Sequence, residues 1–600
     1  MRRLPGIGAA VDRLRFVLRK GRRVRRQWRD GGPARRYTRW VHVMDTPSAA
    51  ELTGLQVRAA QLGSAPVISV ILFPEPRDAS LLDRAVVSIR AQVYQAWEVC
   101  LVLPGESAAV GAAVRRHAAE DPRIRLVPGG TCPAAAAARN IGLAAATGQF
   151  VTVIDGTDVL PAQALLGIAE AIERHPDAAL IYADEDRIDA RGNRHDPWFK
   201  CDCNRELLLT HDAISRPAVY DRGVVHEIGG WRENVSGAED HDLALRVVEA
   251  VGPRRVVHVP RILCHRGSPV HGVAMAADES GRRAVRDLLQ SRGRDAGGEA
   301  APEAPGRHRV RYPLPATPPL VSIMICTRDH ERLLSLAIES ITSRTTYPRY
   351  EIVIVDNGSV EPRAMACLAR LAGRPDVRVL RDDGPFNYAR LNNRAAASAR
   401  GEVLCLLNDD VEVLTPGWLE ELVSFAVQPD VGAVGARLWY PDGTLQHGGV
   451  ILGIGRDVGH AHPRISRGDP SYHGRAVLQQ ELSAVTAACL AVRAELFAAV
   501  AGLDERLGVA FNDVDFCLRL GQAGYRTVWT PYAELVHHES ASRGVDDTPA
   551  KRARAEREAE LLHGRWGESL RRDPFYNPNL SHAAADFSVD APAGARGEAR

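Results

Sequence analysis

Residues 321–359 read "VSIMICTRDHERLLSLAIESITSRTTYPRYEIVIVDNGS", and this stretch decides the fold class. The runs at 321–327 and 351–355 are apolar and rich in β-branched residues, as strands buried on both faces are. Between them, apolar residues recur at helical spacing over 333–344. A strand, a helix and a second strand in this order predict an α/β domain, with a mostly parallel sheet flanked by helices.

The chain carries two copies of this pattern. The segment "PVISVILFPEPRDASLLDRAVVSIRAQ" from Pro66 resembles "PLVSIMICTRDHERLLSLAIESITSR" from Pro319, which lies 253 residues later. The segment "ARNIGLAAATGQFVTVIDGTD" from Ala138 resembles "LNNRAAASARGEVLCLLNDD" from Leu391 at the same offset. A period this long indicates a duplicated domain rather than a solenoid repeat. Farther along, equivalent acidic segments are 273 residues apart, so the second copy has about 20 extra residues.

The two copies divide the chain into five expected regions. Residues 293–318 are rich in Gly, Pro and Ala, which is typical of a linker. We expect a basic helical extension at 1–60, domain one at 61–292, the linker at 293–318, domain two at 319–575 and a tail at 576–600. Both domains are expected to be α/β units with a mostly parallel sheet. The segment "DPFYNPNLS" at 573–581 is expected to pack against the protein.

Composition indicates a soluble globular protein in a reducing compartment. The 600 residues are 45% hydrophobic and 25% charged, with a net charge of only +2. The ten cysteines are scattered and form no disulfide framework or zinc-type clusters. Because we find no apolar run of membrane-spanning length and no signal peptide, we expect a cytoplasmic protein.

The segment 13–30, "RLRFVLRKGRRVRRQWRD", is densely basic with apolar residues interspersed. It fits a solvated helix. It also fits peripheral contact with anionic lipid at the inner face of the plasma membrane, with apolar side chains dipping inward. Nucleic acid is not expected as a partner, because no recognised nucleic-acid-binding motif accompanies the patch.

Asn408, Asp409 and Asp410 end the apolar run "EVLCLL" at 402–407. Such residues close turns by bonding their own backbone, which is one interpretation. The other is a metal site, because hard divalent cations prefer oxygen ligands and the ligands of open α/β sheets gather at the carboxyl ends of strands. Asp356 ends the strand at 351–355, so both acidic groups are expected to open into one crevice.

Two later segments also carry chemistry. Asp513 precedes a helical run, where it serves as an N-terminal cap in one interpretation and as a functional carboxylate in the other. Domain one has Glu239 and Asp240 at the equivalent place. His537 follows an apolar stretch in domain two, and a His recurs in domain one. With Asp410 it would complete a mixed nitrogen and oxygen site for Mn²⁺ or Mg²⁺.

These ordered segments resemble the successive motifs of family 2 glycosyltransferases with the GT-A fold. The resemblance is strongest to bacterial enzymes that build O-antigen or capsule chains, often described as rhamnosyltransferase-like. It rests on "VSIMICTRDH", "EIVIVDNGS", "LNNRAAASARGEVLCLLNDDVEV", "AVTAACLAVRAELFAAVAGLDERL", "FNDVDFCLRLGQAGYR" and "HHESASRG", and it covers most of 319–545. Domain one resembles the same family over 66–268.

The resemblance implies inverting transfer of a sugar from a nucleotide-diphosphate donor to a lipid-linked or polysaccharide acceptor. It assigns Asp513 as the base that activates the acceptor. Asp356 would hold the nucleotide base, and Arg543 would face phosphate. Asn408, Asp409 and Asp410 match the Asp-x-Asp motif, with Asn replacing the first Asp. Asp410 and His537 would bind the metal, with His538 as a rival for the second position.

Domain one departs from the family pattern. "LVLPGES" replaces "VDNGS" and has no Asp at the nucleotide position. Its acidic turn is Asp155-Gly156-Thr157-Asp158, which places Thr where the metal-binding Asp is expected, with Asp158 next to it. The resemblance assigns Asp155 to the donor, Asp158 and His265 to the metal, and Glu239 with Asp240 to catalysis. Domain one is therefore either a second transferase or a decayed copy that binds glycan or supports the structure.

Two other classes of function compete with this interpretation. One is a non-catalytic nucleotide-sugar-binding or glycan-binding protein built from the duplicated fold. The other is a Rossmann dehydrogenase, which is disfavoured because neither "TRDHERLL" nor "EPRDASLL" has the glycine-rich turn that approaches a pyrophosphate.

Overall fold

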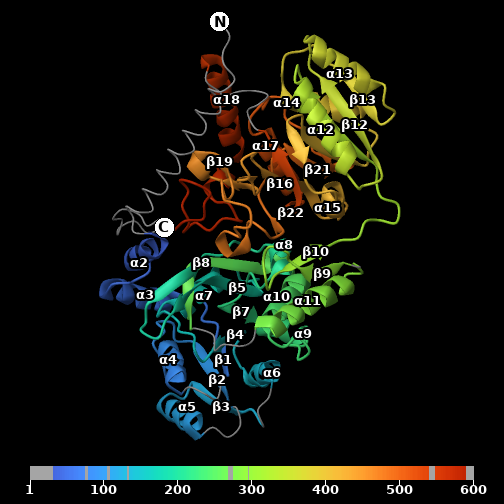
Figure 1. The fold of residues 1–600 in the computed structure, drawn as a ribbon. Coiled ribbons are helices and arrows are strands. Elements are labelled where there is room, and N and C mark those ends of the chain that lie inside the picture. The colour runs from blue at the N-terminus through green and yellow to red at the C-terminus, as the bar shows by residue number, and fades with distance from the viewer. Residues whose placement is uncertain are drawn as a thin grey trace.

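The computed structural model describes residues 32–73, 79–103, 108–130, 134–267, 274–294, 296–538 and 548–589. It contains two α/β domains, with domain one in the lower half of Figure 1 and domain two in the upper half. Each has one large sheet covered by helices, so the predicted fold class is confirmed. Within the described ranges, every helix is too short or too polar to cross a membrane.

The sheet of domain one has the order β3-β2-β1-β4-β7-β5-β6, with β8 paired to β5. Its strands are β1 (Ile68–Phe73), β2 (Trp97–Leu103), β3 (Ile124–Pro128), β4 (Phe150–Asp155), β5 (Leu180–Ile188), β6 (Arg194–Trp198), β7 (Ala218–Asp221) and β8 (Val256–Arg266). Its helices are α4 (Ala79–Arg90), α5 (Ala108–Glu120), α6 (Ala135–Ala145), α7 (Ala164–Arg174), α8 (Arg205–Thr210), α9 (Arg222–Glu227), α10 (Glu239–Val251) and α11 (Ala274–Ser291), with a 3₁₀ turn η1 (Pro253–Arg255). The first four strands are parallel, whereas β7 pairs antiparallel with β4 and β5.

Domain two repeats this order as β13-β12-β11-β14-β21-β16-β22-β15. Its strands are β11 (Val321–Thr327), β12 (Tyr350–Asp356), β13 (Val377–Arg381), β14 (Val403–Asn408), β15 (Val411–Val413), β16 (Val431–Trp439), β17 (Leu445–His447), β18 (Val450–Leu452), β19 (Val458–His460), β20 (Gln480–Glu481), β21 (Cys489–Arg493) and β22 (Arg526–His537). Its helices are α12 (Glu331–Arg344), α13 (Pro362–Ala372), α14 (Tyr388–Ser398), α15 (Trp418–Ala426), α16 (Ala494–Ala499), α17 (Asn512–Gln522) and α18 (Pro549–Trp566), with 3₁₀ turns η2 (Ile454–Arg456), η3 (Tyr472–Gly474) and η4 (Ser569–Arg571).

The stretch at 321–359 folds as predicted. Successive side chains of a strand point to opposite faces of the sheet, and both faces of β11 are buried. Ile323 and Ile325 pack in one hydrophobic cluster with α12, whereas Met324 packs in another with α14. On α12, the buried residues Leu334, Ala337, Ile338 and Ile341 follow helical spacing. One helix therefore covers each face, which leaves the carboxyl end of the strand open.

The strand registers locate the difference in length between the copies. In domain one Phe150 of β4 pairs with Asp221 of β7, and in domain two Val403 of β14 pairs with Arg493 of β21. The first members of these pairs keep the offset seen in the sequence, whereas Asp221 and Arg493 are farther apart than that offset. The second copy is therefore longer in the interval between the paired strands, as predicted. The interval holds β17, β18 and β19, and residues of β17 and β19 line the candidate site described below.

The segment predicted as a linker contains a hairpin, β9 (Gly297–Ala300) and β10 (His308–Arg311). His308, Val310 and Tyr312 alternate with exposed or partly buried residues and are themselves buried, which is the pattern of a strand with one face in a core. The backbone of Val310 exchanges hydrogen bonds with the Gln479 side chain of domain two. In Figure 1 this hairpin lies beside α8, between the two domains.

The extension at 1–60 is described from residue 32, and it contains α2 (Gly32–Met44) and α3 (Ala49–Gln61). Tyr37 and Trp40 of α2 are buried, and Trp40 packs edge-on against Phe199 of domain one. Arg194 of β6 forms ion pairs with Asp45 and Asp186, both at 2.5 Å. The second half of the extension therefore packs on domain one. The basic segment 13–30 lies outside the described residues.

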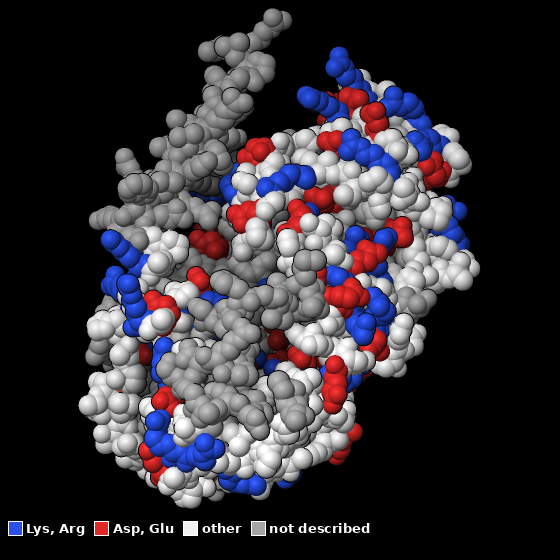
Figure 2. Space-filling view, turned by 60° about the horizontal axis from the view of Figure 1, so that its bottom comes forward, with Lys and Arg blue, Asp and Glu red and all other residues white. Residues whose placement is uncertain are grey.

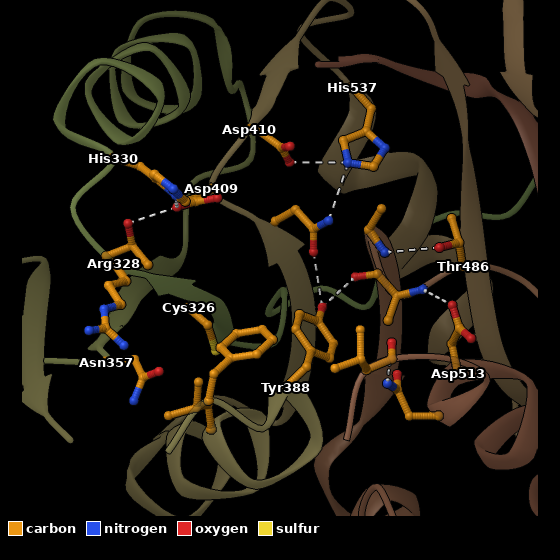
Figure 3. Close-up of a pocket in the computed structure, with 18 of the residues that line it drawn as sticks. Cys326, Arg328, His330, Asn357, Tyr388, Asp409, Asp410, Thr486, Asp513 and His537 are labelled. Carbon is orange, nitrogen blue, oxygen red and sulfur yellow. Dashed lines mark hydrogen bonds and ion pairs between the residues drawn. The ribbon is translucent and has the colours of Figure 1, made fainter. Parts of the chain in front are cut away.

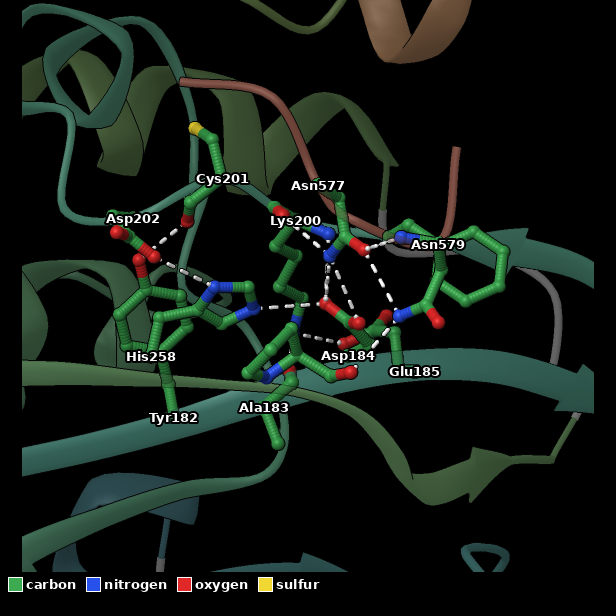
Figure 4. A network of polar contacts seen from close by, with 12 residues as sticks. Tyr182, Ala183, Asp184, Glu185, Lys200, Cys201, Asp202, His258, Asn577 and Asn579 are labelled. Carbon is green, nitrogen blue, oxygen red and sulfur yellow. Dashed lines mark hydrogen bonds and ion pairs between the residues drawn. The ribbon is translucent and has the colours of Figure 1, made fainter. Parts of the chain in front are cut away.

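The tail joins the two domains, and the packing expected for 573–581 is confirmed. The Asn577 amide donates to both carboxylate oxygens of Asp184, at 3.0 and 2.9 Å, and to the carbonyl of Lys200 at 2.7 Å. Figure 4 shows this network, in which His258 also contacts Asp184 at 2.9 Å. Burial lowers the pKa of His258, but the carboxylates of Asp184 and Asp202 outweigh burial and raise it. The tail thus contributes hydrogen bonds to a buried charged cluster of domain one.

A buried ion pair also crosses between the domains. The Arg526 guanidinium of β22 contacts Glu206 of α8 at 2.8 Å and Glu481 of β20 at 3.1 Å. On the face shown in Figure 2, basic and acidic side chains are interspersed over both domains. That face therefore presents no broad patch of one charge among its described residues.

Candidate active site

A cavity of about 420 Å³ lies in domain two at the carboxyl ends of β11, β12 and β14. Loops that follow parallel strands gather at such an edge, which is where α/β sheets bind ligands. Figure 3 shows Asp409, His330, Arg328 and Asn357 along one side, Asp513 and Thr486 along the other, and Asp410 with His537 between the two sides. The other lining residues are Cys326, Thr327, Phe386, Tyr388, Leu391, Asn408, Gln446, His460, Ala487, Ala488, Val509 and Asn512.

Strand pairing brings Asp410 and His537 together, although 127 residues separate them. Val411 of β15 pairs with His537 of β22, so the preceding Asp410 lies beside the imidazole. Their Oδ1 and Nε2 atoms are 3.1 Å apart. His538 directs its backbone N–H to the Asp410 carbonyl, and its ring lies 3.9 Å from Glu412. Of the two histidines considered from the sequence, His537 is therefore the one that faces the cavity with Asp410.

A chain of hydrogen bonds orients His537. Its Nδ1 lies 2.8 Å from the amide oxygen of Gln446, and because an amide oxygen only accepts, Nδ1 carries the proton. In that tautomer Nε2 presents a lone pair, which accepts from the Asn408 amide at 3.2 Å. The Tyr388 hydroxyl donates to the Asn408 oxygen at 3.1 Å, and burial raises its pKa well above the ordinary value.

This arrangement fits a divalent cation. A carboxylate oxygen and an imidazole lone pair face each other at 3.1 Å and line the same cavity. Mn²⁺ and Mg²⁺ accept oxygen and imidazole ligands of this kind, with the remaining positions filled by water or phosphate oxygens. Across the described residues, no three His, Cys, Asp or Glu side chains form a complete metal site, so a cation here would need further ligands from a substrate or water.

Asp409 and Asp513 have different surroundings. The Asp409 carboxylate accepts from the Thr327 hydroxyl at 2.7 Å and contacts His330 Nδ1 at 2.9 Å. It therefore joins the end of β14 to the end of β11. Asp513 lies in the first turn of α17, where one oxygen accepts from its neighbour Val514 N–H at 2.9 Å and the other from Ala487 N–H at 3.0 Å. Both carboxylates line the cavity.

Asp356 is the exception to the expected convergence. Its carboxylate accepts from the Ser359 backbone N–H at 2.9 Å and pairs with Arg381 at 2.6 Å. The side chain is 4% exposed and does not line the cavity, whereas the following Asn357 does. The structure thus gives Asp356 a turn-closing contact, and its assignment to the nucleotide base stays a prediction. Arg543 lies outside the described residues.

Sequence reasoning missed several residues of the cavity. Arg328 follows β11 in the "TRDH" segment, directly after a predicted strand, so a signal was available for it. Tyr388 begins α14 in the "FNYARLNN" segment, where no element was predicted. His460 lies in the segment that only domain two has, where no internal duplicate exists to mark it. Gln446 lies on β17, which pairs with β16 as β6 pairs with β5, and the equivalent strand β6 has no Gln that would mark the position. Thr486, Ala487 and Ala488 precede β21 and reach the cavity through their backbone and small side chains, which leave little pattern in a sequence.

Strand pairing shows which residues of domain one correspond to Asp410 and His537. Val159 pairs with His265 as Val411 pairs with His537. Asp158, rather than Thr157, therefore lies at the position of Asp410, because the acidic turn of domain one is one residue longer. This corrects the alignment drawn from the sequence alone. Burial raises the pKa of Asp158 to about 6.

The side chain of the predicted metal ligand His265 contacts Asp186. Its Nδ1 lies 2.6 Å from Asp186 Oδ1, in the cluster that also receives the Tyr37 hydroxyl and Arg194. The His265 side chain thus contacts β5, at a carboxylate that the N-terminal extension also contacts through Tyr37. Its assignment to a metal stays a prediction with no support from this contact.

Arginine side chains occupy the centre of the domain-one cluster. Arg216 forms ion pairs with Asp155, with Asp158 at 3.3 Å and with Asp240 at 3.0 Å. Arg139 lies 3.2 Å from Asp240 and 3.6 Å from Glu239. Burial raises the pKa of Asp240, but Arg139 and Arg216 outweigh burial and hold it at about 2. The structure therefore brings the predicted residues 155, 158 and 240 together around a guanidinium.

Both copies match one protein family. Residues 69–229 and 322–500 match the family described as Glycosyl transferase family 2. The chain belongs to glycosyl transferase family 2. The resemblance stated from the sequence is confirmed, and the two matches fall within the two domains.

Curated relatives of this family 2 glycosyltransferase extend over both domains. A Sinorhizobium fredii protein named uncharacterized protein y4gI is 44% identical over 89% of this chain and 59% of its own length. The O-antigen biosynthesis protein RfbC of Myxococcus xanthus is 37% identical over 90% of this chain and 42% of its own. The chain thus spans about half the length of these two relatives.

Other similarities cover one part of the glycosyltransferase. The N-acetylglucosaminyl-diphospho-decaprenol L-rhamnosyltransferase of Mycobacterium tuberculosis is 29% identical over 38% of this chain and 78% of its own length. Among solved structures, a Pyrobaculum calidifontis mannosyltransferase in complex with GDP-Man and Mn²⁺ covers 45% of this chain and 70% of its own, with 18% identity and a TM-score of 0.30. Staphylococcus aureus TarS in complex with UDP-GlcNAc covers 37% and 66%, with 15% identity and a TM-score of 0.31.

Proposed function

We propose that domain two transfers a sugar, with inversion, from a nucleotide-diphosphate donor to a hydroxyl of a growing cell-surface glycan. The observation that carries the proposal is the grouping of Asp410, His537 and Asp513 around one cavity of about 420 Å³. Asp410 and His537 supply ligands for a cation on one side, and Asp513 supplies a carboxylate on another.

Asp410 and His537 would hold Mn²⁺ or Mg²⁺. When bound, such a cation neutralises negative charge that develops on the departing nucleoside diphosphate. Gln446 and Asn408 keep His537 in the tautomer and orientation that this role needs. Arg328 lines the same cavity and would add positive charge near the diphosphate.

Asp513 would accept the proton of the attacking hydroxyl. Its two backbone hydrogen bonds fix the carboxylate at the cavity wall opposite Arg328 and Asn357. A base that delivers the acceptor from the face opposite the leaving group produces inversion at the anomeric carbon. An NMR analysis of the product linkage tests this, and retained configuration would contradict it.

The names of the relatives suggest the class of acceptor. RfbC is named for O-antigen biosynthesis, and the mycobacterial relative is named for transfer to a lipid-linked diphospho sugar. We therefore include both lipid-linked and polysaccharide acceptors in the proposal. A lipid-linked acceptor would place the enzyme at the cytoplasmic face of the plasma membrane, where the basic segment 13–30 would contact anionic lipid.

The first test is release of nucleoside diphosphate from a panel of nucleotide sugars, with Mn²⁺ or Mg²⁺ and with a chelator. Asp513→Asn should lower turnover by roughly 10²–10⁴, the usual contribution of general-base catalysis. Glu495→Gln is the matched control, because it removes one carboxylate from the exposed surface of domain two. Full activity of Asp513→Asn, or release that persists in chelator, would contradict the proposal. Donor binding without release or transfer would favour the non-catalytic alternative.

A further inference from the structure

The strand register gives Arg216 a counterpart in domain two. Asp221 of β7 corresponds to Arg493 of β21, and counting back equally from both places Arg216 at the position of Ala488. The contacts agree with this alignment, because Asn408 N–H donates to the Ala488 carbonyl at 3.2 Å and Asp155 contacts Arg216. Ala488 lines the cavity of domain two. Domain one thus replaces a small residue of the cavity wall with the longest cationic side chain.

The side chain of Arg216 points into the acidic cluster. It forms ion pairs with Asp155, Asp158 and Asp240, which correspond to Asn408, Asp410 and Asp513. Those three residues surround the space in which domain two would hold a cation beside its base. The guanidinium therefore lies among the same groups that would otherwise face a metal ion and a diphosphate.

The backbone of Arg216 is also held. Its N–H donates to Glu185 Oε2 at 3.1 Å, and its carbonyl accepts from Lys200 Nζ at 2.9 Å. Lys200 and Glu185 are themselves a buried ion pair at 2.9 Å. A surface arginine that had drifted into the cluster would not have buried charged groups on both sides of its peptide. The position is built by the fold of domain one.

We infer that the Arg216 guanidinium replaces the divalent cation in domain one, so that this copy binds neither a metal ion nor a donor diphosphate and acts as a scaffold for domain two. The inference uses the proposed cation position of domain two as its reference. Two groups of the same charge cannot share one cluster of carboxylates without strong repulsion, and a diphosphate beside Arg216 would also meet Asp155 and Asp240.

The test counts Mn²⁺ bound per full-length chain, by electron paramagnetic resonance of free Mn²⁺. Asp410→Asn combined with His537→Ala removes the domain-two ligands, and this double variant should bind no Mn²⁺. Adding Arg216→Ala should create one site that binds Mn²⁺ at least tenfold more tightly than the double variant does. Adding Arg216→Lys instead should create none, because the positive charge remains. Asp240→Asn added to the Arg216→Ala chain should weaken the new site.

Two results would overturn the inference. One is Mn²⁺ binding by the double variant that Asp240→Asn abolishes; the other is a folded Arg216→Ala chain that gains no site. If Arg216→Ala does not fold, hydrogen exchange of the unmodified protein decides. Adding Mn²⁺ with nucleotide sugars should leave the exchange of residues 150–159 unchanged, and added protection there would refute the inference. These readouts concern domain one alone, so they stay informative if domain two proves inactive in the release assay.

Discussion

The two copies of the domain keep the same sheet and the same acidic residues but differ in what these residues surround. In domain two, Asp410 and Asp513 border an open cavity whose wall includes Ala488. In domain one, Asp158 and Asp240 contact the Arg216 guanidinium. Carboxylates that look like a retained active site in the sequence therefore have opposite surroundings in the fold. The comparison teaches that the two copies differ in the positive group available to their carboxylates, which in domain one is the Arg216 guanidinium, more than in the carboxylates themselves.

The largest expected effect on turnover comes from placing an arginine in domain two at the position that corresponds to Arg216. Ala488→Arg would place a guanidinium among Asn408, Asp410 and Asp513, as in domain one. Because it would fill part of the cavity and compete with a cation for the carboxylates, turnover should fall by at least the roughly 10²–10⁴ expected for loss of the base. Nucleoside diphosphate release and Mn²⁺ binding should be lost together.

Two controls make the Ala488→Arg experiment specific. Ala488→Ser changes the same position by one small polar group and should keep most of the turnover. Thermal unfolding shows whether the Arg variant is folded. A folded Ala488→Arg enzyme that still binds Mn²⁺ and turns over would break the comparison between the copies, since a guanidinium at this position would then be compatible with catalysis.

A medium effect is expected at the contact between the tail and domain one. Asn577→Ala would remove the amide donor from both oxygens of Asp184, which is fully buried. Leaving a buried acceptor without that partner should cost about 1–3 kcal/mol in the free energy of unfolding, measured by chemical denaturation. Asn193→Ala, in an exposed turn of domain one, is the matched control.

The Asn577 result also sharpens the comparison. If domain one positions domain two, Asn577→Ala should also lower turnover, although Asn577 lies outside the cavity. An Asn577→Ala protein with unchanged stability would show that the tail does not hold the two domains together, and the scaffold role of domain one would lose its structural basis.

Much of the fold follows from local patterns in the sequence. The predicted strands 321–327, 351–355 and 402–407 match β11, β12 and β14 to within one residue, because apolar runs buried on both faces leave little ambiguity. The hairpin at 297–311 was missed, because a segment rich in Gly, Pro and Ala reads as a linker even when His308 and Val310 alternate into a core.

The candidate site was less accessible from the sequence, because its geometry depends on register. Alternate residues of a strand face opposite sides, so only one of His537 and His538 could face the cavity, and the pairing of β15 with β22 decided which. Arg216 carried no signal at all. Its correspondence to Ala488 of the domain-two cavity can be recognised only when β7 is superposed on β21.

The last expected effect is a change in acid stability, and it tests the buried charges that hold Arg216. Burial opposes ionisation of Glu185, but Lys200 and Arg266 outweigh burial and lower its pKa from 4.5 to about 2. A carboxylate with a lowered pKa stabilises the fold above its ordinary pKa, and this contribution is lost as the pH falls from about 4.5 to about 2. Over that range the Tm should therefore fall more steeply for the unmodified protein than for Glu185→Gln. The variant should also be less stable at pH 7, because Lys200 would keep a buried charge without its ionised partner. Equal slopes would mean that Glu185 gains nothing from its partners, and the support of Arg216 by a buried ion pair would have to be abandoned.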